Sequence, residues 1–321
     1  MYRQILHGDV LEKFKEIPDE SIDTIITSPP YYKLRTYEAD GEIGQEDSIH
    51  DYIDNLMAVM TECKRALKQA GTCWININDT YEGRSGRKSE VRQRSLMGIP
   101  ERFYIRCIDD GWTMHNHIPW VKKKSLPFSG KRRFQNKWEH IFYMSKSGDP
   151  DVDLDAVRTP HKENRKSATS TANIKGLSVP GQSVQTVKRV KDRQYHPNGK
   201  NPGDIMEFST ADTLTKCRHC DWNSANIKVH IVNDSDVRYC VTCGKSDLLD
   251  HHATFPWQLP HYILKFACPK DGIVLDPFMG SGSTAEAAEK LGLRWCGIEI
   301  NADSILYARK RLAKYLNGRI I

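Results

Sequence analysis

The chain has no long apolar run, and none of its hydrophobic stretches approaches the length of a membrane span. Its first residues, Met1 to Leu6, do not form a signal-peptide pattern. No internal repeat is visible, which argues against a repeat architecture. From these absences we expect an intracellular protein with no membrane partner.

A disulfide framework is also absent from the pattern of cysteines. Four of the nine cysteines form two C-x-x-C pairs, and the other five stand singly in apolar contexts. We predict that the single ones are reduced thiols of the core, because a free cysteine behaves as a small apolar side chain. They are Cys63, Cys73, Cys107, Cys268 and Cys296.

The composition is that of a folded protein, with 39% hydrophobic and 27% charged residues. A length of 321 residues suffices for one sizeable α/β domain with an insertion. The formal net charge of +6 fits a polyanionic partner without requiring one.

Strand and helix patterns alternate at both ends of the chain. The apolar stretch 22–26 predicts a strand that ends at Thr27, and apolar spacing over 51–68 predicts a helix. Ser48 and Asp51 resemble a capping box at the start of that helix, and Gly71 stands where it would stop. Further strands are predicted at 72–77, 115–121, 139–145, 272–275 and 295–298, and further helices at 100–109, 283–291 and 302–316.

These repeated units predict an α/β fold with a doubly wound, mostly parallel sheet covered on both faces. We expect stretch 139–145 to be an antiparallel edge strand. The stretch 146–252 breaks the rhythm, and between Lys162 and Lys200 it holds nine Lys or Arg against two acidic residues. We predict that this basic segment is a partly disordered loop or orders on nucleic acid.

The first motif, Thr27-Ser28-Pro29-Pro30-Tyr31, follows the first predicted strand. Prolines restrict φ and lack an amide hydrogen, so the Pro29 carbonyl can point into a site as a fixed acceptor. The Ser28 hydroxyl is a second acceptor, and two acceptors can hold both hydrogens of an exocyclic amino group. Tyr31 offers a face on which a base can stack. A plain proline turn with Tyr31 in the core is the alternative for an isolated motif.

The second motif, Asp276-Pro277-Phe278-Met279-Gly280-Ser281-Gly282, lies between a predicted strand and a predicted helix. Gly280 and Gly282 allow the backbone to approach a ligand, and the amides that open the helix can hold a carboxylate. Glu299 ends the next strand, where its carboxylate can accept hydrogen bonds from ribose hydroxyls. The same arrangement would serve a nicotinamide dinucleotide, so this half alone leaves an oxidoreductase open.

Together and in this order, the two motifs resemble the beta-type DNA amino-methyltransferases, in which the catalytic half precedes the cofactor half. The resemblance implies S-adenosylmethionine (AdoMet) as cofactor, double-stranded DNA as substrate and a cytoplasmic protein of prokaryotic or phage type. A cognate restriction endonuclease is compatible with it but not required, and the sequence leaves the oligomeric state open.

The resemblance also implies roles for particular residues. Ser28, Pro29, Pro30 and Tyr31 correspond to the catalytic motif. Asp9 would lie near the adenine of the cofactor, Thr254 and Phe255 would line its methionine pocket, and Phe278 would pack beside it. The full set of implied cofactor residues is Asp9, Thr254, Phe255, Asp276, Pro277, Phe278, Gly280, Gly282 and Glu299.

The target atom is predicted to be N4 of cytosine, because Ser is usual in the first motif position of enzymes that resemble cytosine-N4 methyltransferases. Adenine-N6 methylation is the first alternative. Methylation of RNA or of a protein amide is weaker, since those families place the glycine loop before the Pro-Pro-Tyr motif. A non-catalytic zinc-ribbon DNA-binding protein on a methylase scaffold is a further alternative. The chemistry needs no nucleophilic cysteine, which argues against carbon-5 methylation.

Basic residues after the strand at 115–121 are candidate DNA contacts. In enzymes of this resemblance the loop after Trp120 borders the pocket of the target base, and cations there would meet phosphates. For any single one of them, a solvated surface charge is an equal alternative. The candidates are Lys122, Lys123, Lys124, Lys131, Arg132, Arg133 and Lys137.

The two C-x-x-C pairs predict a structural zinc ion. Cys217 and Cys220 are separated by nineteen residues from Cys240 and Cys243, which is the spacing of a four-cysteine zinc ribbon. A redox dithiol is the minor alternative. We therefore expect a catalytic half at 1–150, a variable region for target recognition at 151–252 with the ribbon at about 213–248, and an AdoMet-binding half at 253–321.

Overall fold

The structure is a computed structural model that resolves the chain into two compact units, Leu154–Gly203 and the remainder. In 214–217, 227–232, 235–238 and 248–251 it describes the backbone alone. None of the helices in the described part is both long and apolar enough to cross a bilayer. The residues described are 3–34, 36, 41–83, 91–123, 129–161, 196–210, 214–217, 227–232, 235–243, 245–246, 248–251 and 256–316.

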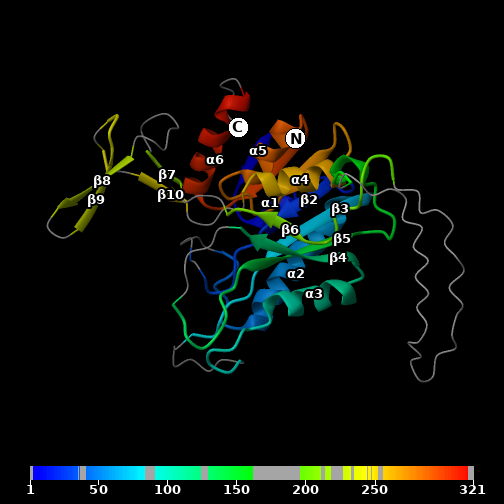
Figure 1. The fold of residues 1–321 in the computed structure, drawn as a ribbon, viewed down its shortest axis with the longest axis horizontal. Helices are drawn as coiled ribbons and strands as arrows, with labels where there is room; N and C mark the ends of the chain where they lie inside the picture. Colours follow the sequence, from blue (N-terminus) through cyan, green and yellow to red (C-terminus); the bar gives the residue numbers. More distant parts are fainter. Residues whose placement is uncertain are drawn as a thin grey trace, which may run out of the picture. The chain divides into compact units, whose positions relative to one another are not determined.

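The larger unit is built on an eight-stranded sheet (Figure 1). Its strands are parallel to one another except β5, which is antiparallel to both of its neighbours. In order across the sheet they are β1 (Gln4–His7), β12 (Arg294–Glu299), β11 (Ile273–Asp276), β2 (Ile22–Thr27), β3 (Leu67–Ile77), β5 (Trp138–Ser145), β4 (Thr113–Lys122) and β6 (Met206–Phe208).

The prediction of an antiparallel edge strand was wrong in its position. The antiparallel strand is the expected one, β5, but β4 and β6 lie beyond it, so that β6 is the edge. All but the first residue of β5 is buried, as expected for a strand with neighbours on both sides. Trp120 joins β6 to the sheet by donating its indole N–H to the Phe208 carbonyl, at 3.2 Å.

Helices cover both faces of the sheet, as the alternation of strand and helix patterns predicts (Figure 1). Neighbouring strand residues point to opposite cores: Ile25 packs in one and Ile26 in the other. One core holds α1 (Val10–Phe14), α2 (Ile49–Ala66) and α3 (Ile99–Asp109), and the other holds α4 (Gln258–Ala267), α5 (Ser283–Lys290) and α6 (Ala302–Leu316).

The start of α2 is confirmed and its end is corrected. The Ser48 hydroxyl accepts the Asp51 amide at 3.0 Å, which is the expected cap. Gly71, however, does not stop the helix, because Leu67 already begins β3 and Gly71 lies within that strand. A Cβ at position 71 would come within 2.9 Å of the Asp23 carbonyl oxygen, so close strand packing explains this glycine.

Four short strands occupy the part of the chain for which a zinc ribbon was predicted. β7 (Leu214–Cys217) pairs with β10 (Leu248–His251), and β8 (Ile227–Val232) pairs with β9 (Ser235–Cys240), both antiparallel. In the smaller unit, a 3-10 helix spans Asp155–Val157, and Asp155 accepts hydrogen bonds from Arg158 and Asn198. Most of the predicted basic segment, 162–195, lies outside the described residues.

The connections of the sheet diverge between β2 and β11. From β2 the chain passes through α2 to β3 on one side, and from β11 it passes through α5 to β12 on the other. Such a switch point leaves a crevice outside the carboxyl ends of the two strands. The strand ends at this point are Thr27 and Asp276, so the topology brings both sequence motifs to the same crevice.

Candidate active site

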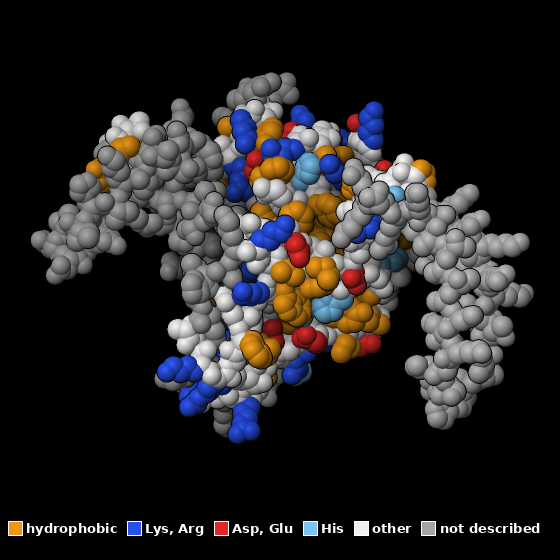
Figure 2. Space-filling model, viewed as in Figure 1, with side chains coloured by type: hydrophobic (Ala, Val, Ile, Leu, Met, Phe, Trp, Pro, Cys, Tyr) orange, Lys and Arg blue, Asp and Glu red, His pale blue; other side chains and the backbone are white. Residues whose placement is uncertain are grey.

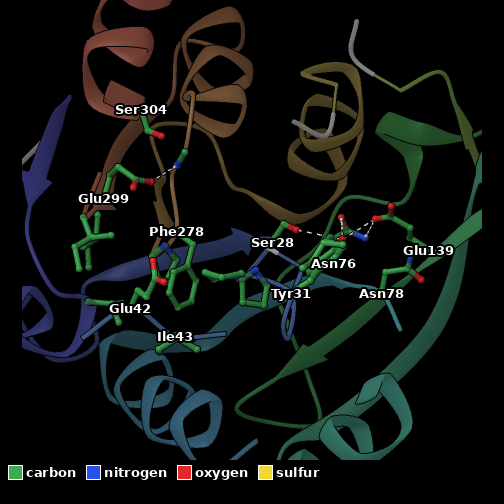
Figure 3. A pocket seen from close by; sticks show the side chains of 18 of the residues that line it. Ser28, Tyr31, Glu42, Ile43, Asn76, Asn78, Glu139, Phe278, Glu299 and Ser304 are labelled. Atoms are coloured by element: carbon green, nitrogen blue, oxygen red, sulfur yellow. Dashed lines mark hydrogen bonds between the residues drawn. The ribbon is translucent and has the colours of Figure 1, made fainter. Parts of the chain in front are cut away.

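Both motifs line one cavity of about 430 Å³ at the carboxyl ends of the central strands. Its side chains run from Glu299 and Phe278 at one end, past Ser28 and Tyr31, to Glu139 at the other (Figure 3). Of the residues predicted from the sequence, those that line it are Asp9, Ser28, Pro29, Pro30, Tyr31, Lys122, Pro277, Phe278, Gly280 and Glu299.

A buried carboxylate joins the two motifs beneath the cavity. The Thr27 hydroxyl donates to Asp276 at 2.6 Å, and the Thr284 hydroxyl of α5 donates to the other carboxylate oxygen at 2.6 Å. The Phe278 amide also donates to Asp276, at 3.1 Å. Asp276 is 3% exposed and does not line the cavity, so its geometry favours positioning of the loop over contact with a ligand.

The glycine loop is held against Glu299. The Gly280 amide donates to one carboxylate oxygen at 2.7 Å and the Asn301 amide to the other at 2.8 Å. Burial raises the pKa of Glu299, and these amides act against that rise. Each carboxylate oxygen keeps a second lone pair, so two further donors, such as a pair of hydroxyls, can still bind.

Gly282 allows the glycine loop to pack closely against α6 and does not line the cavity. It adopts a left-handed φ of +80° at the start of α5, and its Cβ would lie 3.2 Å from the Cβ of Ala308 in α6. The cavity is lined by Gly280 but not by Gly282 or Ser283. The close approach of backbone to ligand predicted for both glycines is therefore available at Gly280 alone.

Carboxylates gather at the Glu299 end of the cavity. Asp9 caps α1 through one oxygen, which accepts the Leu11 amide at 2.9 Å and the Glu12 amide at 3.1 Å. Glu42 also lines the cavity and accepts the Thr36 hydroxyl at 2.7 Å. An acidic, partly apolar end of this kind suits a cationic ligand that also carries hydroxyl groups.

The two prolines differ in what their carbonyl groups contact. The Tyr52 hydroxyl of α2 donates to the Pro30 carbonyl at 2.8 Å. Gly44 packs on the same turn, because a Cβ there would lie 3.3 Å from the Tyr31 carbonyl oxygen. No donor that the structure describes contacts the Pro29 carbonyl, so the turn is fixed from outside while Pro29 keeps its acceptor.

Tyr31 is the centre of a hydrogen-bond network at the other end of the cavity. Its hydroxyl donates to Glu139 at 2.7 Å and lies 3.3 Å from the Asn76 amide oxygen. The Ser28 hydroxyl donates to Tyr31 at 3.4 Å, and the Asn76 amide nitrogen donates to Glu139 at 3.1 Å. Burial, together with the nearby Glu139 carboxylate, raises the pKa of Tyr31 well above its usual value. The hydroxyl therefore stays protonated and holds the ring in one orientation.

Lys122 completes this network instead of standing on the surface. Its ammonium group forms an ion pair with the buried Glu139 carboxylate and lies 5.7 Å from the Trp120 ring centroid. This environment does not favour the phosphate contact predicted for Lys122. The other candidates that the structure describes are exposed: Lys123, Lys131, Arg132, Arg133 and Lys137.

Several predicted site residues cannot be placed in this arrangement. Lys124, Thr254, Phe255 and Cys220 lie outside the described residues. Cys217 is described by its backbone alone, whereas Cys240 is buried and Cys243 is exposed. In the part of the chain that the structure describes, no three His, Cys, Asp or Glu side chains are grouped to hold a metal ion.

Three residues of the hydrogen-bond network around Tyr31 and Pro30 were not predicted as such. Asn76 follows an apolar run in β3, and Glu139 and His140 are buried polar residues that precede an apolar run in β5, which is a signal that the strand pattern offers. Tyr52 lies in the stretch 51–68 whose apolar spacing predicted a helix, and its hydrogen bond to Pro30 has no counterpart in the sequence pattern. All three become visible once β2, β3, β5 and α2 are placed together.

Comparison with known proteins gives one family across most of the chain. The model of the N6/N4 DNA methylase family matches residues 22–310. The type II methyltransferase M.SfiI of Streptomyces fimbriatus is 28% identical over 92% of this chain and 87% of its own length.

Solved structures share the fold. The cytosine-N4-specific PvuII DNA methyltransferase superposes with a TM-score of 0.63 at 20% identity, over 98% of this chain and 93% of its own. A protein of Thermus thermophilus, assigned as a DNA modification methylase and complexed with S-adenosyl-L-methionine, gives 0.55 at 21% identity, over 98% and 96%. At these identities the likeness is one of fold.

The buried Asp276 carboxylate predicts a distinctive pH dependence. Burial raises its pKa from 3.8 to about 6, so the folded state binds a proton between these values that the unfolded chain does not. The contribution of Asp276 to stability therefore falls as pH rises through this window. In urea unfolding, the free energy of unfolding of Asp276→Asn, taken relative to that of the wild type, should rise by about 2 kcal/mol from pH 4.5 to pH 7.5. A difference independent of pH would contradict this assignment.

Proposed function

The chain belongs to the N6/N4 family of DNA methylases, and from this premise we propose that it transfers a methyl group from AdoMet to N4 of cytosine in double-stranded DNA. The observation that carries the proposal is the shared cavity. Ser28 and Glu299 come from motifs far apart in the sequence and line the same space. A transfer reaction needs both partners in one such space, with the reacting atoms aligned.

The Glu299 end fits AdoMet. Glu299 offers lone pairs to the ribose hydroxyls, and Phe278 presents an aromatic side chain in the cavity wall. Asp9 and Glu42 add negative charge near a ligand that carries a sulfonium cation. When bound, AdoMet would supply an activated methyl group. The chain's own part is to hold it with that methyl group directed at Ser28.

The Ser28 end fits an exocyclic amine of a base that has left the duplex. Ser28 and Pro29 would accept the two amine hydrogens, which turns the nitrogen lone pair towards the methyl donor. Tyr31 would stack on the base, with its ring held by Glu139 and Asn76. The methyl carbon–sulfur bond would break as the nitrogen–carbon bond forms, which leaves S-adenosylhomocysteine, and the methylated amine would then release one proton to water. Positioning carries most of the acceleration.

Cytosine is proposed over adenine for two reasons. Ser occupies the first position of the catalytic motif, as is usual in enzymes that resemble cytosine-N4 methyltransferases. The PvuII enzyme, which shares the fold, is itself cytosine-N4-specific. Adenine-N6 methylation is the competing activity, because both bases present a similar amino group.

We also propose that Cys217, Cys220, Cys240 and Cys243 bind one structural zinc ion. Each C-x-x-C pair begins on the last residue of a strand, β7 for the first pair and β9 for the second. The second pair then enters a turn. Four thiolates would close the coordination of zinc, and this staple would stabilise strands too short to form a core. The basic segment and ribbon together are proposed to contribute to recognition of the DNA site.

The direct test of the reaction is incubation with methyl-labelled AdoMet and mixed-sequence duplex DNA, followed by mass spectrometry of the nucleosides. N4-methylcytosine is the expected product. N6-methyladenine would retain the site and the mechanism but overturn the assignment of the base. Label in RNA alone, or no label despite measured AdoMet binding, would overturn the proposed function.

Single variants at the two ends of the cavity should have different effects, one on the Kd for AdoMet and the other on kcat. Glu299→Gln removes a charged hydrogen-bond acceptor and should raise the Kd for AdoMet roughly 10- to 100-fold. Ser28→Ala should lower kcat by a similar factor while the Kd for AdoMet stays within about twofold of the wild type. Isothermal titration and single-turnover methylation measure the two effects. Weakened AdoMet binding in Ser28→Ala would contradict the assignment of AdoMet to the Glu299 end and of the acceptor amine to the Ser28 end.

Zinc can be tested on the purified protein by elemental analysis. We expect about one zinc per chain and its loss in the double variant Cys240→Ser, Cys243→Ser. Cys268→Ser is the matched control, since it removes a thiol that stands alone in α4's cap. A wild type without zinc, or a double variant that keeps it, would contradict the proposed site.

A further inference from the structure

The loop between β4 and β5 carries the most exposed large apolar side chain in the described part of the chain. Phe134 is 95% exposed, and the next most exposed, Ile205, is 60% exposed. A phenylalanine left in water contributes nothing to the core, and such exposure marks a contact site when its surroundings point to a partner. The proposed methylation reaction does not use this residue, and no predicted role includes it.

Described residues on either side of Phe134 in the β4–β5 loop make specific contacts. The Lys122 amide donates to the Lys137 carbonyl at 2.8 Å, which closes the base of the loop. The Arg133 guanidinium lies 3.7 Å from the centroid of the Tyr81 ring, and the Tyr81 hydroxyl donates to Asn136 at 3.3 Å. Anchors therefore stand on both sides of Phe134, and they present its ring outward.

Positive charge is concentrated on the segment that carries Phe134 and on a neighbouring one. Lys131, Arg132 and Lys137 are exposed on the same loop, and no acidic side chain in the described part of the chain forms an ion pair with them. Arg92 and Arg94 are exposed on the neighbouring segment, which a bridge between Tyr81 and Leu96 holds next to Tyr81. Figure 2 shows Lys and Arg side chains gathered at the lower left of its view. A polyanion fits this surface better than a protein does.

The loop begins and ends at the cavity wall. Lys122, just before the loop, and Glu139, just after it, both line the cavity. Thr80, which precedes Tyr81, lines it as well. Phe134 stands five residues from Glu139, a separation that the backbone spans in at most about 18 Å. A duplex bound to these cations would therefore bring its bases close to both the cavity and the phenyl ring.

From this placement, we propose that Phe134 enters the base stack of duplex DNA beside the target base, while the cations around it hold the phosphates. Removal of a base from the stack costs pairing and stacking energy, and it leaves a gap. Apolar side chains that enter a stack fill such gaps in other DNA-binding proteins. The loop would thus favour the extruded base that the Ser28 end of the cavity accepts. This inference rests on the proposed function.

The test compares two duplexes that carry the site mapped from the wild-type product, one with the target base paired and one with it mispaired. A mispaired base leaves the stack at little cost, so it needs no wedge. Phe134→Ala should slow single-turnover methylation of the paired duplex roughly 10- to 100-fold. On the mispaired duplex its rate should come within about threefold of the wild type.

Two control variants separate insertion into the stack from other effects. Ile105→Ala removes an exposed apolar side chain from α3 and should leave both rates unchanged. Phe134→Trp retains an aromatic wedge and should retain most of the rate on the paired duplex. A 2-aminopurine placed at the target position, with thymine opposite so that it is paired, should brighten with the wild type and remain dim with Phe134→Ala.

The outcomes distinguish a failure of the proposed insertion of Phe134 from a failure of the proposed methylation activity. Equal loss on both duplexes would overturn the wedge and leave Phe134 as a simple binding contact. Unchanged rates in Phe134→Ala, with an active wild type, would overturn the inference while the methylation activity stands. A wild type that methylates no DNA, and so yields no site to map, would overturn both.

Discussion

A single buried carboxylate holds the two halves of the site together. Asp276 ends β11 and accepts the hydroxyl of Thr27, which ends β2, at 2.6 Å. The same carboxylate accepts Thr284 of α5 and the Phe278 amide, so strand, loop and helix meet on one group. Burial opposes its charge and these donors favour it, which makes the arrangement depend on all three remaining in place. The catalytic motif begins on the residue after Thr27, and its distance from the glycine loop follows from this contact.

The cavity above this contact is chemically divided. Carboxylates gather at the Glu299 end, while the other end presents neutral acceptors backed by Glu139 and its ion pair with Lys122. The acidic end suits a cationic methyl donor, and the neutral acceptors suit an amine that is not charged. Tyr31 is oriented through its hydroxyl, and its side chain lines the cavity in which a base would stack on it. Outside the cavity, exposed cations of the β4–β5 loop would attract the phosphates of the proposed DNA substrate.

The sequence predicted the strands, helices and motifs of this site better than the strand order and the side-chain contacts around it. Periodicity located β2 and α6, and motif order indicated which half is which, because strand ends and glycine turns leave local signals. The positions of β5 and β6 depend on which strands pair, and no local signal records pairing. For the same reason Lys122 was predicted only as a candidate phosphate contact: its ion pair with Glu139 forms when β4 and β5 lie side by side. Gly71 was misassigned because a glycine after a helix pattern also suits a close strand contact.

We propose that one cavity holds the methyl donor at Glu299 and the acceptor amine at Ser28. The decisive experiment is a crystal structure with S-adenosylhomocysteine and duplex DNA containing the mapped site. We expect ribose hydroxyls on Glu299, an extruded base stacked on Tyr31, and its amine in hydrogen-bond contact with Ser28 and the Pro29 carbonyl. The sulfur should face that amine across the space that a methyl group would fill. A ligand bound away from Glu299, or a target base outside the Ser28 end, would contradict it.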